Sequence, residues 1–361
     1  MICHLGLGTA LRVRCKVILP IIVYISGSKA ANWIHSEYKK SQIDAVIYYG
    51  MLIPERMPIC NVCARCQIPT FDEITEFPFL GRGKKLYRIL ELKLFMNYYL
   101  LKDSGILCIS NSLCKHIQTH LQKAAKNIPV KLFGILVEDD KFRCLAASPQ
   151  SSLPTDCDQY LAYCGSMYGD KDGVSDLIKA LSFAKIKHPE LKLVIMGDNS
   201  HKKRMHQIDE ALESTNCRDS VIFTGRIPWE VMHQILCGAA ALVLAKPKNI
   251  QNEGAFPTKL GEYLACGKPV LTTSVGDIPL FLKHKENALL SRPNDPIGFA
   301  DNITLCLNDT TLKAKIAKNG LALAETVFSH ANSAQELLNF ITKVKGDISA
   351  TSGEQLKTKK R

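Results

Sequence analysis

The segment GAFPTKLGEYLACGKPVLTTSVGDIP, residues 254–279, decides the fold. It reads as a loop, a helix and a buried strand in succession. Gly254 gives a flexible loop, Pro257 suits the first turn of a helix that continues over 258–266, and 267–269 end this helix and start an apolar strand. The start of such a helix presents unpaired backbone N–H groups and the positive end of a dipole. This arrangement is an anion site suited to a diphosphate.

Two charged residues of this helix bear on that interpretation. Lys259 lies in the first turn, where a cation is locally unfavourable unless an anion sits between its ammonium and the backbone amides. Glu262 lies about one turn further on and can accept hydrogen bonds from a ribose. An ordinary loop–helix–strand unit with a surface lysine explains the local chemistry about equally well, because a glycine followed by a helix is common in α/β folds.

The rest of the chain alternates between short apolar runs and amphipathic stretches. Runs that are apolar on both faces are typical of parallel strands covered by helices. We expect strands at 44–49, 68–74, 105–110, 129–137, 160–164, 192–196, 221–224, 241–245 and 269–273. We expect helices at 84–102, 112–124, 174–187, 203–214, 228–238, 257–266, 296–308 and 311–326. This alternation over 361 residues predicts an α/β protein with two doubly wound, Rossmann-like domains, whose ligand binds at the carboxyl ends of the strands.

The expected domain boundaries follow from breaks in this pattern. We predict a first domain over 1–142, a linker over 143–156, a second domain over 157–327, a closing helix over 328–345 and a disordered basic tail over 346–361. The first domain is expected to be short at its amino end, with fewer strands than the second. The stretch 17–25 is expected to be a buried strand or helix, and Gly6 and Gly8 are not preceded by a strand of useful length.

The charge and hydropathy of the chain limit its partners. A formal net charge of +12 is compatible with nucleic acid, an anionic membrane surface or an anionic small substrate. The sequence contains no zinc finger or RNA-binding aromatic motif, so nucleic acid is not expected. No apolar run reaches the ~18 residues of a membrane span, and 17–25 lacks a convincing signal-peptide cleavage site. We therefore expect a cytoplasmic protein, with peripheral contact at the inner membrane surface.

The fourteen cysteines are scattered, which suits the cytoplasm. Several lie inside apolar runs, where free cysteine behaves as a small hydrophobe: Cys108, Cys164, Cys237 and Cys266. A second group, Cys60, Cys63 and Cys66, has the spacing of a metal half-site but falls on one face of a helix and lacks a fourth ligand. We expect these thiols to be packed in the fold and predict no metal.

The string PTKLGEYLACGKPV, residues 257–270, closely resembles the donor-site segment of the family 4 retaining glycosyltransferases of the GT-B architecture. Further segments resemble that family in the same order, at 66–79, 107–113, 163–181, 221–236 and 328–340. The resemblance implies transfer of a sugar from a nucleoside diphosphate sugar to a hydroxyl, with retention, in polysaccharide or glycolipid assembly. It makes the first domain the acceptor side and the second the donor side. It implies a glycan or lipid-linked acceptor and no metal or other cofactor. The alternatives are a nucleotide-sugar epimerase of the same fold and a catalytically impaired binding subunit.

The resemblance also implies roles for individual residues. Lys171 would neutralise the donor phosphates, and main-chain groups near Arg226 and Ile227 would face the base. Glu262 would bind the ribose. The remaining donor-binding positions are Gly165, Ser166, Gly254, Ala255, Phe256, Thr258, Lys259 and Leu260.

Two positions depart from the family pattern. The family has an arginine where this chain has Ser166, and Lys246 or Lys259 could compensate for it. The first of the family's paired glutamates would fall at Gly254, so we expect the loop to shift and bring Glu253 to the donor sugar. Glu253 and Lys171 are therefore the expected catalytic residues, while Glu73 and Glu76 are expected on the acceptor side.

Overall fold

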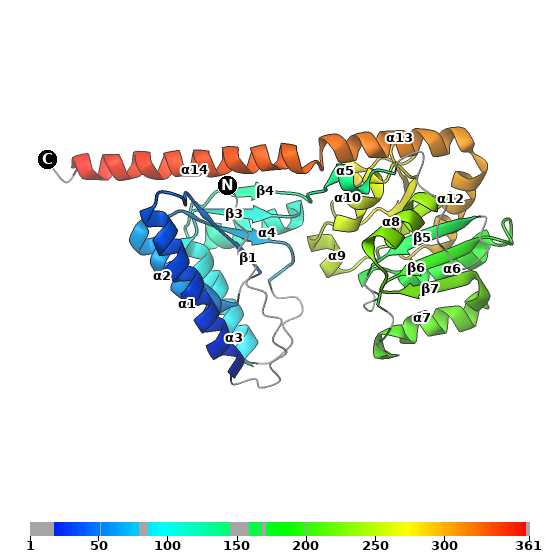
Figure 1. Cartoon of the computed structure of the whole chain (residues 1–361), viewed down its shortest axis with the longest axis horizontal. Helices are drawn as coiled ribbons and strands as arrows, with labels where there is room; N and C mark the ends of the chain where they lie inside the picture. The colour runs from blue at the N-terminus through cyan, green and yellow to red at the C-terminus, as the bar shows by residue number, and fades with distance from the viewer. Residues whose placement is uncertain are drawn as a thin grey trace. The chain divides into compact units, whose positions relative to one another are not determined.

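The computed structural model describes residues 18–50, 52–78, 86–144, 159–165, 167, 171–198, 200 and 202–358. The chain divides into two compact units. Unit 1 takes the described residues up to Phe133 together with those from Glu336 onward, and unit 2 is Gly134–Gln335. Each unit contains a parallel sheet with helices packed against it (Figure 1). The predicted α/β class is confirmed.

Unit 1 is built on a parallel sheet with the order β1-β2-β3-β4. Its strands are β1 (Val46–Tyr49), β2 (Thr70–Ile74), β3 (Gly105–Cys108) and β4 (Val130–Leu132), and each falls within a predicted strand. Its helices include α1 (Ile18–Lys39), α2 (Ile53–Cys66), α3 (Leu86–Leu94), α4 (Asn111–Lys123) and most of α14 (His330–Thr358). The stretch 17–25 therefore contributes to a helix, whereas Gly6 and Gly8 lie outside the described residues.

A buried ion cluster fastens α2 to the sheet of unit 1. The guanidinium of Arg56, which is 1% exposed, donates to Asp72 in β2 and, at 2.6 Å, to Asp103, which precedes β3. Thr70 also donates to Asp103, at 2.9 Å. Burial raises the pKa of Asp103 to about 7, and the charge of Arg56 opposes this rise. The cluster satisfies charges that could not be buried singly.

Unit 2 has a parallel sheet of six strands in the described residues, against four in unit 1, in the order β10-β9-β8-β5-β6-β7. The strands are β5 (Tyr160–Cys164), β6 (Lys192–Met196), β7 (Val221–Gly225), β8 (Ala241–Leu244), β9 (Val270–Thr273) and β10 (Leu289–Ser291). The central strands β5, β8 and β9 are buried almost throughout, as expected when helices cover both faces. We did not predict β10, whose three residues are too few to show a period.

Helices lie on both faces of the second sheet (Figure 1). The predicted helices appear as α6 (Val174–Ala184), α7 (Lys202–Thr215), α8 (Trp229–Gly238), α10 (Thr258–Ala265), α12 (Pro296–Asn308) and α13 (Thr310–Thr326). Three single-turn helices were not predicted: α5 (Asp139–Phe142), α9 (Ile250–Gly254) and α11 (Ile278–Phe281). Helices this short bury too few residues to leave a helical period in the sequence.

Two predicted boundaries are corrected. Residues 134–142 were predicted to lie in the first domain but belong to unit 2. Val137 N–H donates to Phe328 O at 2.9 Å. Ile135 and Val137 also lie so close to Gly261 of α10 that a side chain at Gly261 would overlap them. The tail from residue 346 is not disordered, since α14 (His330–Thr358) continues through most of it. Extending an existing helix adds one hydrogen bond per residue fixed, and residues 346–358 contain no proline. Most of the predicted linker lies outside the described residues.

Two further expectations concern membranes and thiols. Within the described residues, no helix is both long enough and apolar enough to cross a membrane. Cys60, Cys63 and Cys66 all lie on α2, where Cys63 is buried and the other two are half-buried. Cys60 contacts the hydroxyl of Tyr48 at 3.3 Å, so this thiol is part of the packing of unit 1.

Candidate functional site

Two lysines converge on one buried carboxylate in unit 2. Asp172 lies in the segment between β5 and α6 and is 2% exposed. Its Oδ1 accepts a hydrogen bond from Lys246 Nζ at 2.6 Å, and its Oδ2 accepts one from Lys259 Nζ, also at 2.6 Å. The hydroxyl of Tyr163 donates to the same Oδ2 at 2.7 Å. We call these four residues the Asp172 cluster.

The topology of the sheet explains why these residues meet. Tyr163 belongs to β5 and Asp172 follows it, while Lys246 comes directly after β8. Strands β5 and β8 are neighbours at the point where the strand order reverses, with β6 and β7 on one side and β9 and β10 on the other. In open α/β sheets, ligands bind beyond the carboxyl ends of the strands at such a point. The Asp172 cluster therefore occupies the usual ligand position of this fold.

The electrostatics of the cluster favour an anion. Burial would raise the pKa of Asp172, but Lys259 and Lys246 outweigh it and lower the value to about 2, so the carboxylate is ionised at neutral pH. Burial lowers the pKa of Lys246, against the attraction of Asp172, and the charge of Lys171 lowers it further. Two ammonium groups thus contact one carboxylate, and the charge of Lys171 acts on the same place, which leaves an excess of positive charge.

Close packing directs Lys259 into the cluster. A Cβ at Gly165 would overlap the Lys259 ammonium and the Tyr163 hydroxyl in their present positions, so Gly165 leaves room for both groups just after β5. Helix α10, which carries Lys259, is fixed to β5 through the buried Tyr263. The hydroxyl of Tyr263 accepts a hydrogen bond from Cys164 N–H at 2.6 Å. The Tyr263 contact holds α10 against the carboxyl end of β5.

The short helix α9, which carries Glu253, is anchored to the loop of Lys171. Asn249 caps the helix by accepting from Asn252 N–H at 2.8 Å. The buried Asn252 then donates to the carbonyls of Lys171, at 3.1 Å, and Pro247, at 2.8 Å. Glu253 follows it in the last turn of α9 and is half-buried. Asn252, which we did not single out, is thus the link between α9 and the loop of Lys171.

The end of α9 and the loop that follows it carry three of the predicted backbone donors. Gly254 is buried, Ala255 is half-buried, and Phe256 buries its ring against Phe281 and Phe328. In the first turn of α10, Thr258 is exposed and the Leu260 side chain is fully buried. Phe256 and Leu260 therefore have only backbone groups to offer a ligand.

Other predicted residues lie apart from the Asp172 cluster or outside the described chain. Arg226 and Ile227 follow β7, two strands away from β5, and Arg226 donates to Asp198 Oδ2 at 3.0 Å. Glu262 lies about one turn beyond Lys259, where burial raises the pKa of its carboxyl while Lys259 and Lys141 oppose the rise.

Ser166 lies outside the described residues. Glu73, in β2, and Glu76, just after it, belong to unit 1.

Sequence reasoning missed Asp172 and Tyr163, although Lys259 pointed to the first of them. We argued that a lysine in the first turn of α10 needs an anion, and the structure provides one from the protein itself. The position of Lys259 is therefore explained without a bound diphosphate. Its ammonium donates to Asp172 and, at 3.1 Å, to Tyr163 OH, and a lysine has a third N–H to offer.

A correction concerns the cysteines of unit 2. We described Cys237 as a free apolar thiol, but it forms a disulfide with Cys144, whose Cα lies 5.5 Å away, within the usual range for bridged pairs. Cys144, His233 and Cys237 form a group of possible metal ligands in the described part of the chain. The two sulfur atoms of this group are bonded to each other in the disulfide.

Comparisons with known proteins agree with the fold. Residues 158–309 match the model of the family glycosyl transferases group 1. Among curated proteins, the chain is 26% identical over 170 residues to N-acetyl-alpha-D-glucosaminyl L-malate synthase of Bacillus anthracis, covering 47% of this chain and 41% of that protein. It is 25% identical over 218 residues to a GDP-mannose-dependent monoacylated alpha-(1-6)-phosphatidylinositol monomannoside mannosyltransferase of Corynebacterium glutamicum, covering 59% of this chain and 54% of that protein. The chain thus spans about half the length of these relatives.

A solved structure extends the likeness to both units. HepE of Anabaena, crystallised with UDP and glucose, superimposes with a TM-score of 0.69 at 16% identity, over 88% of this chain and 81% of that one. At this identity the likeness shows the fold. The chain therefore has the two-unit α/β fold of the GT-B glycosyltransferases, and its second unit matches the glycosyl transferases group 1.

Proposed function

We propose that this protein transfers a sugar from a nucleoside diphosphate sugar to a hydroxyl acceptor, with retention of configuration. The observation that carries the proposal is the excess of positive charge around Asp172 at the reversal of strand order, beside the start of α10. The match of residues 158–309 to a glycosyltransferase family and the UDP bound by a protein of the same fold support it.

The diphosphate would bind between the first turn of α10 and the lysines of the Asp172 cluster. Lys259 can keep its bonds to Asp172 and Tyr163 and still donate its third N–H to a phosphate oxygen. Lys171 and the backbone N–H groups of 254–256 and 258 would add further donors, because Pro257 has none. Negative charge builds up on the diphosphate as it departs, and preorganised ammonium and N–H groups stabilise that charge without a metal.

The rest of the donor would extend in two directions from the diphosphate. The base would lie near Arg226 and Ile227, beyond β7, and Glu262 would accept from the ribose hydroxyls. The sugar would lie towards Glu253, because Asn252 anchors α9 directly beside the Lys171 loop. These roles assign binding to Glu262 and catalysis to Glu253 and Lys171.

We also propose a lipid-linked acceptor reached at an anionic membrane surface. One face of α3 in unit 1 exposes four apolar side chains at helical spacing: Leu86, Ile89, Leu90 and Leu94, which are 43–73% exposed. The same helix carries Arg88 and Lys93, and the chain as a whole carries a net charge of +12. An apolar stripe with basic neighbours is typical of helices that lie in a membrane interface.

Turnover measurements test the reaction. The purified chain is incubated with UDP- and GDP-sugars, with and without lipid-linked or glycan acceptors, in EDTA and in manganese. We expect consumption of one donor that depends on an acceptor, persists in EDTA and yields the retained anomer. Conversion of the donor to its epimer would replace transfer by epimerisation. Nucleotide binding without any turnover would identify a catalytically impaired binding subunit instead.

A further inference from the structure

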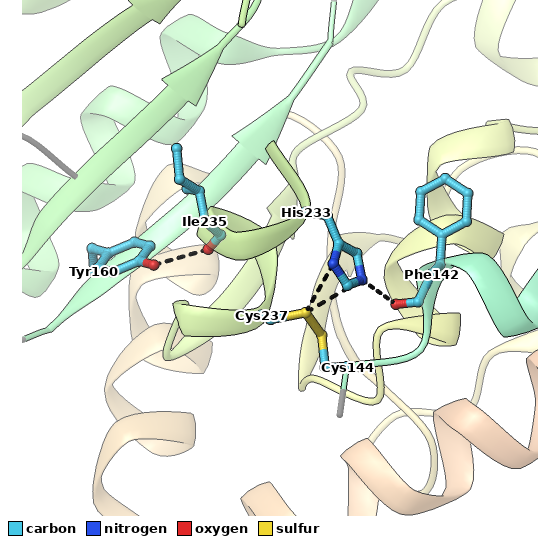
Figure 2. The surroundings of a disulfide bond; sticks show 6 residues. All are labelled: Phe142, Cys144, Tyr160, His233, Ile235 and Cys237. Carbon is cyan, nitrogen blue, oxygen red and sulfur yellow. Dashed lines mark hydrogen bonds between the residues drawn. A yellow bond between two sulfur atoms is a disulfide. The ribbon is translucent and has the colours of Figure 1, made fainter. Parts of the chain in front are cut away.

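The disulfide of unit 2 joins two segments that are 93 residues apart in the sequence (Figure 2). Cys144 lies two residues beyond the end of α5, and Cys237 lies in the last turn of α8. Both residues are half-buried. By contrast, Cys217, Cys266 and Cys306 of the same unit are buried free thiols.

A histidine stands beside one of the two sulfurs. His233 precedes Cys237 by four residues on α8, so the two side chains share a helix face. Its Nε2 lies 3.5 Å and its Nδ1 3.9 Å from Cys237 Sγ (Figure 2). Nε2–H donates to Phe142 O at 3.1 Å, so in the neutral ring Nδ1 is the nitrogen that can accept a proton. The ring also stacks against Trp229, with ring centroids 5.5 Å apart. In the reduced protein, an imidazole in this place can take the thiol proton and leave a thiolate. The thiolate is the form that reacts in disulfide exchange.

The disulfide fastens one end of the segment 134–144. Near its other end the segment is held by Val137, whose N–H donates to Phe328 O at 2.9 Å and whose carbonyl accepts from His330 N–H at 3.2 Å. On the far side of the bond, α8 is fixed to β5, because Tyr160 OH donates to Ile235 O at 2.9 Å (Figure 2). Closing the bond therefore ties this segment to a helix that is itself anchored on the sheet.

We propose that Cys144 and Cys237 form a reversible thiol–disulfide exchange site that locks the segment 134–144 onto α8, with His233 activating Cys237. This role does not depend on the proposed transfer reaction. The co-reactant is a low-molecular-weight disulfide. The Cys237 thiolate attacks one sulfur of this small disulfide and forms a mixed disulfide with it. The S–S bond of the small disulfide breaks, and its other half leaves as a thiolate that takes up a proton. The Cys144 sulfur, losing its proton, then attacks Cys237 Sγ in the mixed disulfide and expels the second thiolate. The protein loses two electrons and two protons, and the small disulfide becomes two thiols.

Thiol mapping in glutathione buffers tests the exchange. The full chain is equilibrated over a range of oxidised-to-reduced glutathione ratios without denaturant, quenched in acid, alkylated and analysed by peptide mass spectrometry. We expect Cys144 and Cys237 to pass together from alkylated to bridged and back as the ratio is changed. The buried Cys266 and Cys306 should carry no glutathione at any ratio. In Cys144→Ser, a glutathione mixed disulfide should accumulate on Cys237.

Two matched variants and one structural measurement separate exchange from a merely structural bridge. His233→Gln keeps a donor for Phe142 O but removes the base, so exchange should slow about tenfold, whereas His206→Gln, on the exposed α7, should leave the rate unchanged. Amide hydrogen exchange of 134–144 should be faster in the reduced protein.

The proposal is overturned if the bond resists reduction in the folded protein, or if both thiols stay alkylatable in the most oxidising buffer. It is also overturned if the reduced protein binds stoichiometric zinc at these residues and cannot be oxidised.

Discussion

The Asp172 carboxylate and the Lys259 ammonium lie 2.6 Å apart at the point where the strand order of the second sheet reverses. Lys259 occupies the first turn of α10, where its charge opposes the helix dipole, and Asp172 offsets that charge. The same carboxylate also pairs with Lys246. One aspartate therefore keeps two lysines in place, and its loss should be felt in the stability of unit 2.

Asp172→Asn is expected to lower the free energy of unfolding by about 3–5 kcal/mol, because it leaves two ammonium groups near each other without their buried counter-charge. Urea unfolding followed by circular dichroism measures the change. Asp301→Asn, an exposed aspartate on α12, should change stability by no more than about 0.5 kcal/mol. Equal stabilities of the two variants would contradict the role of Asp172.

The stabilisation by Asp172 should depend on pH in the acid range. Its pKa in the folded state is about 2, below the ordinary value of 3.8. A carboxyl with a lowered pKa contributes its stability above the unfolded pKa and loses it as the pH falls through the folded pKa. The stability difference between the natural protein and Asp172→Asn should therefore shrink by about 2 kcal/mol between pH 4 and pH 2. Urea titrations at intervals across this range measure it, and a constant difference would argue against the shift.

Glu253 and Glu262 should differ in their kinetic effects. Glu262→Gln weakens a contact made by the bound donor in both ground and transition state, so KM for the donor should rise with kcat little changed. Glu253→Gln should lower kcat about 100-fold or more with a smaller change in KM, because its role is in the transition state. Initial rates over a range of donor concentrations separate the two. Glu286→Gln, in an exposed turn, is the control. A Glu253→Gln variant with full kcat would remove Glu253 from catalysis.

The apolar face of α3 should bind anionic membranes. We expect the protein to co-sediment with phosphatidylglycerol vesicles at low salt, and Leu90→Glu to reduce its partition about tenfold, through lost apolar burial and added charge repulsion. Leu280→Glu replaces a leucine of unit 2 that is 57% exposed, close to the 56% of Leu90, and should have little effect. Failure of the natural protein to bind, or equal loss in both variants, would count against a membrane surface on α3.

The sequence predicted the long elements of this fold because their apolar periods are complete. All nine expected strands were found, and residues 254–279 form the loop, helix and strand read from them, as α10 and β9. What escaped prediction was mostly short or depended on distant partners. The exception is α2, whose 14 residues contain Pro54 and Pro58 and were expected to be helical only around its cysteines. Strand β10 and helices α5, α9 and α11 are too short to show a period.

The candidate site was predictable only in part for the same reason. Lys171, Lys246 and Lys259 were recognised as phosphate-binding candidates, yet nothing in the local sequence shows that Asp172 holds two of them. That contact arises because the parallel sheet places β5 beside β8. The pairing of Cys144 with Cys237 likewise joins positions 93 residues apart, and cysteine spacing alone does not reveal such a bond.

Titration of nucleoside diphosphates against the purified chain tests the donor site most directly. Isothermal titration with UDP and GDP is compared for the natural protein, Lys259→Ala and Lys315→Ala, an exposed lysine of α13. Loss of a charged hydrogen bond at Lys259 should weaken binding of the preferred nucleotide by about 1.5–3 kcal/mol, or roughly 10–150-fold. Lys315→Ala should bind like the natural protein. Unchanged affinity of Lys259→Ala for both nucleotides, or no binding of either by the natural protein, would contradict a donor site at the start of α10.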